Sequence, residues 1–274
     1  MLADGALVER ERGTPQGGVI SPLLANLFLH YAFDVWLKRG FGGVPFERYA
    51  DDIICHCRSE RQALALRATL ERRFSECGLA LHPEKTKIVY CKDTNRKGEF
   101  AAIQFDFLGY TFRPRLAKWR GGLYGVSFLP AASPKALKAI RQTVRGWSLQ
   151  TRSDKTLTDL ARMFNPYIRG WINYYSHFYK SALYPTLLRI DAHLLRWVQR
   201  KFKRFRQRPR GARVWLAGVE RLAEAGVEPS VDSVGDRFAR SPGRSTSSAP
   251  TIRYSRSMQG HHRASGPTST SAKV

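Results

Sequence analysis

Residues 46–57 read FERYADDIICHC, and this stretch decides the fold. Two short apolar runs flank the adjacent carboxylates Asp51 and Asp52, which predicts a strand, a turn and a second strand. Side chains alternate along a strand, so Tyr49 and Asp51 should share a face while Asp52 points elsewhere or caps the turn. Adjacent aspartates also occur in ordinary turns, so any chemical role depends on the surrounding sequence.

Helical and strand patterns surround this hairpin. Upstream, Ser21-Pro22 offers a cap and a first-turn proline for a helix whose apolar residues recur at helical spacing as far as Gly40. Downstream, Ser59 and Gln62 form a capping-box pattern, and Gly78 ends the helix that they open. Strands are predicted at about 79–81, 86–91 and 104–112. Residues 1–112 therefore predict an antiparallel sheet with helices.

From Ser133-Pro134 onward the pattern is all helical. Apolar residues recur at helical spacing in three stretches, which are 137–147, 157–175 and 187–205. A connector at 113–132 joins this helical part, residues 133–216, to the sheet-bearing part. Residues 217–274 hold many serines and few large apolar side chains, so we expect a disordered tail. The expected fold class is α+β.

The charge of the chain indicates a polyanionic partner. The formal net charge is +24, and the stretch from Arg189 to Arg213 holds ten Lys or Arg and one acid, Asp191. Aromatic residues lie among the basic ones, which favours nucleic acid over an anionic membrane, because bases stack on aromatic faces. The expected RNA-binding residues are Arg196, Arg200, Lys201, Lys203 and Arg204. A merely solvated helix face is the alternative.

A membrane span is not expected. The most apolar stretch, Val19 to Leu37, is interrupted by Asn26, His30 and Asp34. The four cysteines show no CxxC pair, which is typical of reduced thiols in a cytosolic protein. We therefore expect a cytoplasmic protein of bacterial type that associates with nucleic acid and not with a membrane.

Five blocks in order along the chain carry a family resemblance. They are GTPQGGVISPLLAN at 13–26, YADD at 49–52, LHPEKTK at 81–87, FDFLGY at 105–110 and WINYY at 171–175. They resemble, in turn, the segment before the palm helix, the palm signature, the downstream lysine segment, the primer grip and the maturase-specific thumb of group II intron-encoded reverse transcriptases. The resemblance covers about residues 10–215. It implies a partial reverse transcriptase palm followed by a helical thumb/maturase domain.

The resemblance implies roles for these blocks. Asp51 would be a direct ligand of two catalytic Mg²⁺ ions, with Asp52 beside it in a secondary role, because carboxylates are hard oxygen ligands. The expected template- and substrate-binding residues are Gln16 and Gly17 against the nascent base pair, Tyr49 and Ala50 of the signature, Lys85 as a charge for a phosphate, and Phe107, Leu108 and Gly109 as a brace for the primer end. The plainer alternatives are a solvated strand residue for Lys85 and core packing for Phe107 and Leu108.

The sequence departs from the family pattern at its beginning. Polymerases of this family need another Asp on a first palm strand, upstream of the block at Gly13, and only twelve residues precede Gly13 here. Asp4 falls in what resembles a connecting loop and is a poor substitute. We therefore expect an N-terminally truncated chain that lacks the fingers and that alone does not extend a DNA primer.

The function that the resemblance implies is RNA-directed DNA synthesis together with maturase-type help in folding and splicing intron RNA. Its expected partners are intron RNA and an RNA template with a DNA primer. A separate fingers/palm fragment or a homodimer are the open alternatives for a protein partner. Two competing functions remain, which are a non-catalytic RNA-binding splicing protein and an inactive mobile-element remnant. The missing first Asp favours these two for the isolated chain.

Overall fold

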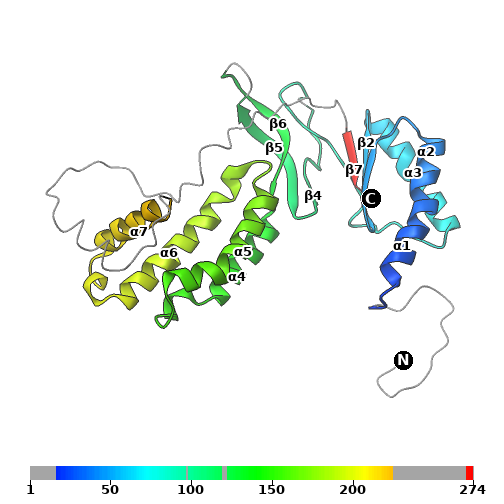
Figure 1. Cartoon of the computed structure of the whole chain (residues 1–274). Helices are drawn as coiled ribbons and strands as arrows, with labels where there is room; N and C mark the ends of the chain where they lie inside the picture. Colours follow the sequence, from blue (N-terminus) through cyan, green and yellow to red (C-terminus); the bar gives the residue numbers. More distant parts are fainter. Residues whose placement is uncertain (1–16, 97, 119–121, 225–269, 274) are drawn as a thin grey trace. The chain divides into compact units, whose positions relative to one another are not determined.

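The computed structural model describes residues 17–96, 98–118, 122–224 and 270–273 (Figure 1). These residues form two compact units. The palm unit takes the described residues up to Phe107, together with Phe112–Phe128 and the strand at 270–273. The helical unit takes Leu108–Thr111 and the described residues from Leu129 onward, apart from that strand.

The palm unit is an antiparallel sheet with helices, as the sequence predicts. Its helical elements are α1 (Ser21–Leu29), the π-helical turn η1 (His30–Val35), α2 (Trp36–Gly40) and α3 (Glu60–Glu76). Its sheet runs in the order β1-β2-β7-β3, with β1 (Phe46–Tyr49), β2 (Asp52–Cys57), β3 (Lys87–Val89) and β7 (Thr270–Lys273). Strands β1 and β2 form the predicted hairpin, in which Tyr49 lies opposite Asp52. The helix α1 begins at Ser21, so its N-cap is Ile20 and not the predicted Ser21.

Both faces of strand β2 are covered by apolar side chains. Ile53, Cys55 and Cys57 face the buried stripe of α3 and the residues Phe33 and Leu37. That stripe consists of Ala63, Leu66, Leu70 and Phe74, as predicted. Ile54 on the other face packs with Val89 and Phe105. Burial raises the pKa of the Cys55 thiol to about 12, which fits a packing role for this cysteine.

The strands after β3 agree with the sequence prediction at 104–112 and correct it beyond that range. A second sheet has the order β4-β5-β6, with β4 (Phe105–Phe107), β5 (Tyr110–Lys118) and β6 (Tyr124–Ala132). Most of the predicted connector at 113–132 is therefore strand, whereas the predicted strand at 79–81 is not formed. Alternating Arg and Pro at 113–115 hide the apolar period of β5, since they interrupt the run on which a strand prediction depends.

The described part of the second unit is built mainly from four α-helices. They are α4 (Pro134–Gly146), α5 (Leu157–Tyr175), α6 (Tyr184–Lys201) and α7 (Pro209–Glu224). Ser133 caps α4 by accepting a hydrogen bond from the Ala136 amide at 3.1 Å, and Thr156 forms a capping box with Asp159 at the start of α5. No described helix is long and apolar enough to cross a membrane.

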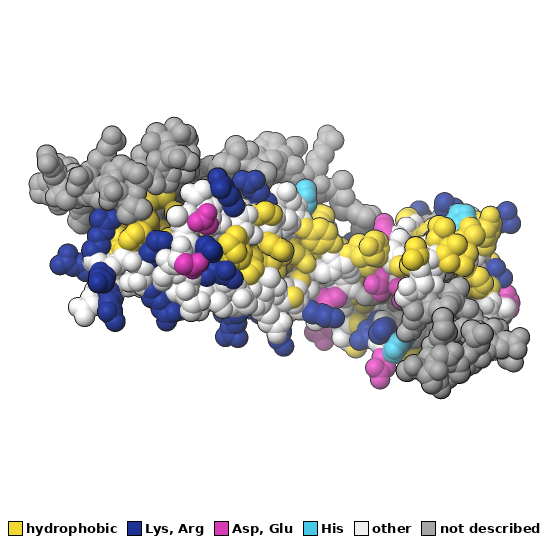
Figure 2. Space-filling view, turned by 60° about the horizontal axis from the view of Figure 1, so that its bottom comes forward, with side chains coloured by type: hydrophobic (Ala, Val, Ile, Leu, Met, Phe, Trp, Pro, Cys, Tyr) yellow, Lys and Arg dark blue, Asp and Glu magenta, His cyan; other side chains and the backbone are white. Residues whose placement is uncertain are grey.

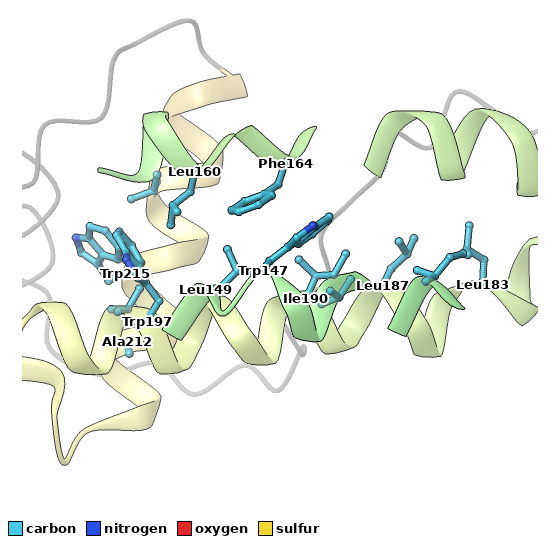
Figure 3. Close-up of a cluster of buried hydrophobic side chains, with 14 residues drawn as sticks. Trp147, Leu149, Leu160, Phe164, Leu183, Leu187, Ile190, Trp197, Ala212 and Trp215 are labelled. Carbon is cyan, nitrogen blue, oxygen red and sulfur yellow. The ribbon is translucent and has the colours of Figure 1, made fainter. Parts of the chain in front are cut away.

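The helices enclose one aromatic-rich core (Figure 3). Trp147 stacks on Phe164 with ring centroids 4.4 Å apart. Trp197 of α6 is 1% exposed, and its indole N–H donates to the Arg152 carbonyl at 2.8 Å. Trp147 therefore joins the end of α4 to α5, and Trp197 fixes α6 against the loop that ends at Arg152.

The predicted tail is shorter than expected. Residues 217–224 continue α7, whose Ala212, Trp215 and Val219 are buried at helical spacing. Residues 270–273 form β7, which pairs antiparallel with β2 and β3. The rest of the predicted tail lies outside the described residues. The short polar sequence of β7 carries no apolar period, so its pairing could not be predicted from the pattern.

Candidate active site and nucleic-acid interface

The two aspartates lie on a tight turn of the palm unit. Ala50 and Asp51 connect β1 to β2, and Asp52 is the first residue of β2. Ala50 has a φ of 54°, in the left-handed region that a residue with a Cβ rarely adopts. Asp51 and Asp52 are both exposed. The turn therefore presents two adjacent carboxylates to solvent on a strained backbone that other contacts must hold.

Arg48 supplies those contacts. Its Nε and Nη2 donate to the two carboxylate oxygens of Asp34, each at 2.7 Å. Its Nη1 donates to the Asn26 side-chain oxygen at 2.9 Å and to the carbonyl of Ala50 at 3.1 Å. One guanidinium thus ties the Asp51 turn to α1 and η1. The fork geometry of arginine makes these simultaneous bonds feasible.

The pair between Arg48 and Asp34 is largely buried. The side chains are 12% and 13% exposed, respectively. Burial by itself would raise the pKa of the Asp34 carboxyl, but the hydrogen bonds and charge of Arg48, with a smaller part from His30, outweigh burial and lower this pKa. Asp34 is consequently ionised at neutral pH and holds Arg48 in a fixed orientation.

A cavity of about 640 Å³ opens beside the turn. Its lining residues include Asp51 and Asp52, the exposed Lys85 and Lys87, and Asp106 of β4. Ala25, Phe28 and Leu29 of α1 contribute an apolar side. The structure thus brings together the YADD block, the lysine block, the start of the FDFLGY block and part of the α1 block. Asp106 is a lining carboxylate that the sequence analysis did not single out.

Other predicted site residues lie away from this cavity. Tyr49, 64% exposed, and Ala50 are not among its lining residues. Gly17 has a φ of 85° and no neighbour within 4 Å of the position that a Cβ would take, which leaves its backbone open to approach. Gln16 lies outside the described residues. Phe107 packs at the edge of the core around Ile54, which fits the core alternative.

The Leu108-Gly109 turn is held within the helical unit. Both residues have positive φ, 48° and 76°, so this two-residue hairpin places a leucine in the left-handed region. The Tyr174 hydroxyl donates to the Leu108 carbonyl at 2.8 Å, and the Ser133 amide donates to the Gly109 carbonyl at 2.9 Å. A Cβ on Gly109 would lie 2.9 Å from the Tyr175 hydroxyl oxygen, so any other residue would require Tyr175 to shift and would also strain the backbone at this φ.

Aromatic packing around Tyr110 adds to the hydrogen bonds that hold the Leu108-Gly109 turn. The Tyr110 ring contacts Tyr174, Tyr175 and Phe178 at centroid distances of 5.3, 5.4 and 5.5 Å. The Tyr110 hydroxyl donates to the carbonyl of Tyr174, and burial raises the pKa of Tyr110 to about 12. The tyrosines of the WINYY block therefore hold the FLG turn, a link that the separate motifs do not reveal.

Basic side chains gather over the helical unit (Figure 2). Arg196, Arg200, Lys203 and Arg204 are exposed. Lys201 is only partly exposed, and its ammonium donates to the Ser153 carbonyl at 3.1 Å and to that of Lys155 and lies 5.4 Å from the Trp197 ring centroid. The exposed Arg200 makes one longer bond of this kind, from Nη1 to the Gln150 carbonyl at 3.4 Å. These contacts give Lys201 a structural role that the charge pattern alone does not suggest.

Comparison with known families assigns both units. Residues 4–112 match the reverse transcriptase (RNA-dependent DNA polymerase) family, and residues 137–215 match the group II intron maturase-specific domain. The chain belongs to the group II intron reverse transcriptase/maturase family. No curated protein matches it at a significant level. Reverse transcriptases generally use a divalent metal ion, and the two domains together imply nucleic-acid partners such as intron RNA.

The domain matches follow the two units except at one segment, because the reverse transcriptase match also takes in Leu108–Thr111 of the helical unit. The reverse transcriptase match includes the hairpin, the cavity and the FLG turn. The maturase match includes α4, α5, α6 and the first part of α7. Within the described residues, no three His, Cys, Asp or Glu side chains form a group that could hold a metal ion. Asp51 and Asp52 are therefore a pair of candidate ligands rather than a closed metal site.

The strained leucine of this reverse transcriptase/maturase gives a testable expectation. Leu108→Asn should stabilise the chain by about 1 kcal/mol, because asparagine tolerates the left-handed region better than leucine. Leu116→Asn is the control, since Leu116 is an exposed leucine on a strand, where asparagine is disfavoured. Urea unfolding of both variants measures the effect. A loss of stability in Leu108→Asn would show that the leucine side chain stabilises the turn more than its backbone strain costs.

Proposed function

We propose that the palm unit contributes Asp51 and Asp52 to a two-Mg²⁺ centre for RNA-templated nucleotide addition. The observation that carries this proposal is the cavity that the two aspartates share with Lys85 and Lys87. Carboxylates and cations at one opening suit a substrate whose phosphates are bridged by metal ions. Two adjacent carboxylates leave coordination positions for water and substrate oxygens, which is how Mg²⁺ is usually bound.

Each candidate residue would then have one role in this reaction. Asp51 and Asp52 would hold Mg²⁺, which, when bound, activates the attacking oxygen and stabilises the leaving one. Lys85 would bind a phosphate of the incoming nucleotide as a point charge. Gly17 would let the backbone approach the nascent base pair, and the Leu108-Gly109 turn would brace the primer end. Arg48 would keep the Asp51 turn in place through the Ala50 carbonyl.

Primer extension tests this part of the proposal. The measurement uses a DNA primer on an RNA template with Mg²⁺, for the chain alone and with a separately expressed palm fragment that carries the family's first palm Asp. Extension that persists unchanged in Asp51→Asn would rule out the assignment of Asp51.

The helical unit has a second proposed role, which is maturase-type binding of intron RNA. The observation that favours it is the row of exposed Arg196, Arg200, Lys203 and Arg204 at the end of α6 and just beyond it. Charges of one sign at this density have little use in a folded unit except to meet a polyanion. The 4.7 Å approach of Arg204 to the Phe205 ring leaves the guanidinium on the surface, where it can reach a phosphate.

Replacing Arg200, Lys203 and Arg204 with Gln should weaken the binding of structured RNA and of RNA of arbitrary sequence to a similar extent. The slope of log affinity against log salt should fall by about 0.7–0.9 for each lost phosphate contact. Filter binding over a salt series measures this slope. Lys201→Gln serves as the contrast, because its bonds to Ser153 and Lys155 predict a lower melting temperature with little change of slope. An unchanged slope in the triple variant would mean that these residues only keep the helix solvated.

A further inference from the structure

A second cavity lies within the helical unit, between α4 and α6. It measures about 210 Å³ and is separate from the end of α6 that carries the residues discussed above. Lys138, Arg141 and Arg145 line it from α4, and Arg189 and His193 line it from α6. Thr186, which is 2% exposed, lies at its floor. Arg189 and His193 lie within the basic stretch at 189–213, but the sequence does not show that it meets a second basic row on α4.

Helical spacing explains why these side chains converge. Lys138, Arg141 and Arg145 stand three and four residues apart, so they share one face of α4. Thr186, Arg189 and His193 share one face of α6 for the same reason. The buried Ile140, Val144, Leu187 and Ile190 pack the two helices together beneath these rows. The cavity is therefore held by the core of the unit and does not depend on a loop.

The cavity has an uncompensated positive potential. No Asp or Glu is among its lining residues. The nearest acid along α6, Asp191, is two residues from His193 and so lies on roughly the opposite side of the helix. Four cations around so small a volume repel one another, and an anionic ligand would remove that cost. A tetrahedral anion with several acceptor oxygens matches the forked donors of three arginines.

His193 makes the cavity sensitive to proton binding. Its Nδ1 lies 3.0 Å from the Gln150 side-chain oxygen, so with hydrogen on Nδ1 the ring donates to Gln150 and leaves Nε2 for a ligand. Burial lowers the pKa of His193 first, and the charges of Arg196 and Arg145 lower it further. The facing groups, Lys138, Arg141, Arg145, Arg189 and Arg196, are all cationic, so the imidazole is neutral at pH 7 in the free protein.

We propose that the cleft between α4 and α6 is a binding site for a backbone phosphate of RNA, in which His193 becomes protonated as the phosphate binds. This inference rests on the proposed RNA-binding function and adds a site and a pH response to it. A bound phosphate lowers the local positive potential and adds an acceptor beside the ring, so it raises the pKa of His193 above its value in the free protein. Binding therefore takes up a proton, and RNA affinity rises as pH falls through the bound-state pKa, levelling off below the free-state pKa.

The first experiment measures RNA binding by the full chain with a labelled hairpin RNA over a salt series. Arg141→Gln/Arg189→Gln should lower affinity on the order of tenfold and reduce the salt slope by about 1.4–1.8, for two contacts. Arg162→Gln/Arg169→Gln is the matched control, because both arginines are exposed on α5 and line no part of the cleft. Equal losses in the two double variants would reflect net charge alone and would overturn the site.

The second experiment measures affinity for the same RNA at pH 8, 7 and 6. The wild-type affinity should rise about 3- to 10-fold from pH 8 to pH 6, since one linked proton contributes at most about tenfold per pH unit. His193→Gln should abolish this rise, whereas His177→Gln, an exposed histidine outside the cleft, should keep it. A rise that survives in His193→Gln contradicts the proposal. The comparison of His193→Gln with His177→Gln still tests the proposed site if the arginine variants fold poorly.

The outcomes separate this site from the function on which it rests. If the wild-type chain binds no RNA, both the RNA-binding function and the phosphate site are rejected. If the wild-type chain binds RNA and the cleft variants keep the same salt slope and pH response, only the phosphate site is rejected. Inorganic phosphate that raises the melting temperature of wild type but not of Arg141→Gln/Arg189→Gln, while RNA binding is equal in both, would reassign the cleft to a small anion and overturn the RNA proposal.

Discussion

Asp51→Asn should reduce nucleotide addition on the order of 100- to 1,000-fold in any preparation that extends a primer, whether that is this chain alone or the chain with a palm fragment added. The substitution keeps the size of the side chain but removes the charge that would bind Mg²⁺ in the proposed centre, and metal-ion stabilisation of the transition state amounts to several kcal/mol. RNA affinity should change little, because Asp51 contacts no phosphate directly. Single-turnover extension and filter binding measure the two quantities separately.

Two further carboxylates provide the controls. Asp52→Asn should reduce nucleotide addition less than Asp51→Asn does, in keeping with the secondary role proposed for Asp52. Asp106→Asn makes the same change of charge in the same cavity but from β4. Equal losses for Asp51 and Asp106 would indicate that the charge of the cavity matters and that no single ligand does. Equal losses of turnover and RNA affinity in Asp51→Asn would point to a role in folding.

Sequence patterns predict the helices and strands whose formation depends on residues close together in the sequence. The β1–β2 hairpin follows from two apolar runs around the aspartates, and the α3 stripe of Ala63, Leu66, Leu70 and Phe74 follows from its period and its Ser59 cap. The helices α4, α5 and α6 were likewise predicted from spacing within one element. The antiparallel sheet with helices and the helical unit were therefore available from the sequence, and with them the α+β class.

The contacts that position the candidate site could not be predicted in the same way. Arg48 lies 14 residues from Asp34 and 22 from Asn26, and Tyr174 lies 66 residues from Leu108. Such pairings depend on how whole elements pack, and a single sequence carries no period that reports them. The left-handed Ala50 and Leu108 are further examples, since neither is a residue type that signals a positive φ.

Charge patterns leave the packing of each cation undetermined for a related reason. The density of Lys and Arg after Arg189 does not tell a surface cation from one that caps carbonyls, so Lys201 was grouped with its exposed neighbours. The cationic cleft between α4 and α6 was missed because its members come from two helices that are about 50 residues apart. Helix spacing shows that each row shares a face, but only packing shows that the two faces meet.

Arg48→Ala should destabilise the palm unit by about 2–3 kcal/mol at neutral pH. The substitution leaves the Asp34 carboxylate, 13% exposed, without its bidentate partner, and it frees the carbonyl of Ala50. Breaking a fully buried pair from one side costs about 3–5 kcal/mol, and the residual exposure of both side chains reduces that value. Arg58→Ala is the control, because Arg58 is exposed and its substitution should change stability by no more than about 0.5 kcal/mol. Urea unfolding measures both.

The effect of Arg48→Ala should also depend on pH in a definite direction. The pKa of Asp34 is lower in the folded chain than in the unfolded one, so the stabilisation by Arg48 is complete above the unfolded value of about 3.9 and is lost as pH falls through the lower folded value. The difference between wild type and variant should therefore be constant from pH 7 to pH 5 and shrink only below about pH 4. A difference that already shrinks near neutral pH would show that the ionisation of the Asp34 carboxyl does not govern the stabilisation by Arg48.

Arg48→Lys separates the structural role of this residue from its role at the turn. Lysine keeps the positive charge beside Asp34, so most of the stability should remain, but a single ammonium cannot reach Asp34, Asn26 and the Ala50 carbonyl together. The Asp51 turn should consequently lose its anchor, and turnover should fall about tenfold or more with little change in primer–template affinity, since misplacing a metal ligand affects the transition state first. Normal turnover in Arg48→Lys would mean that the turn holds its position without the Ala50 contact, and that Arg48 serves stability alone.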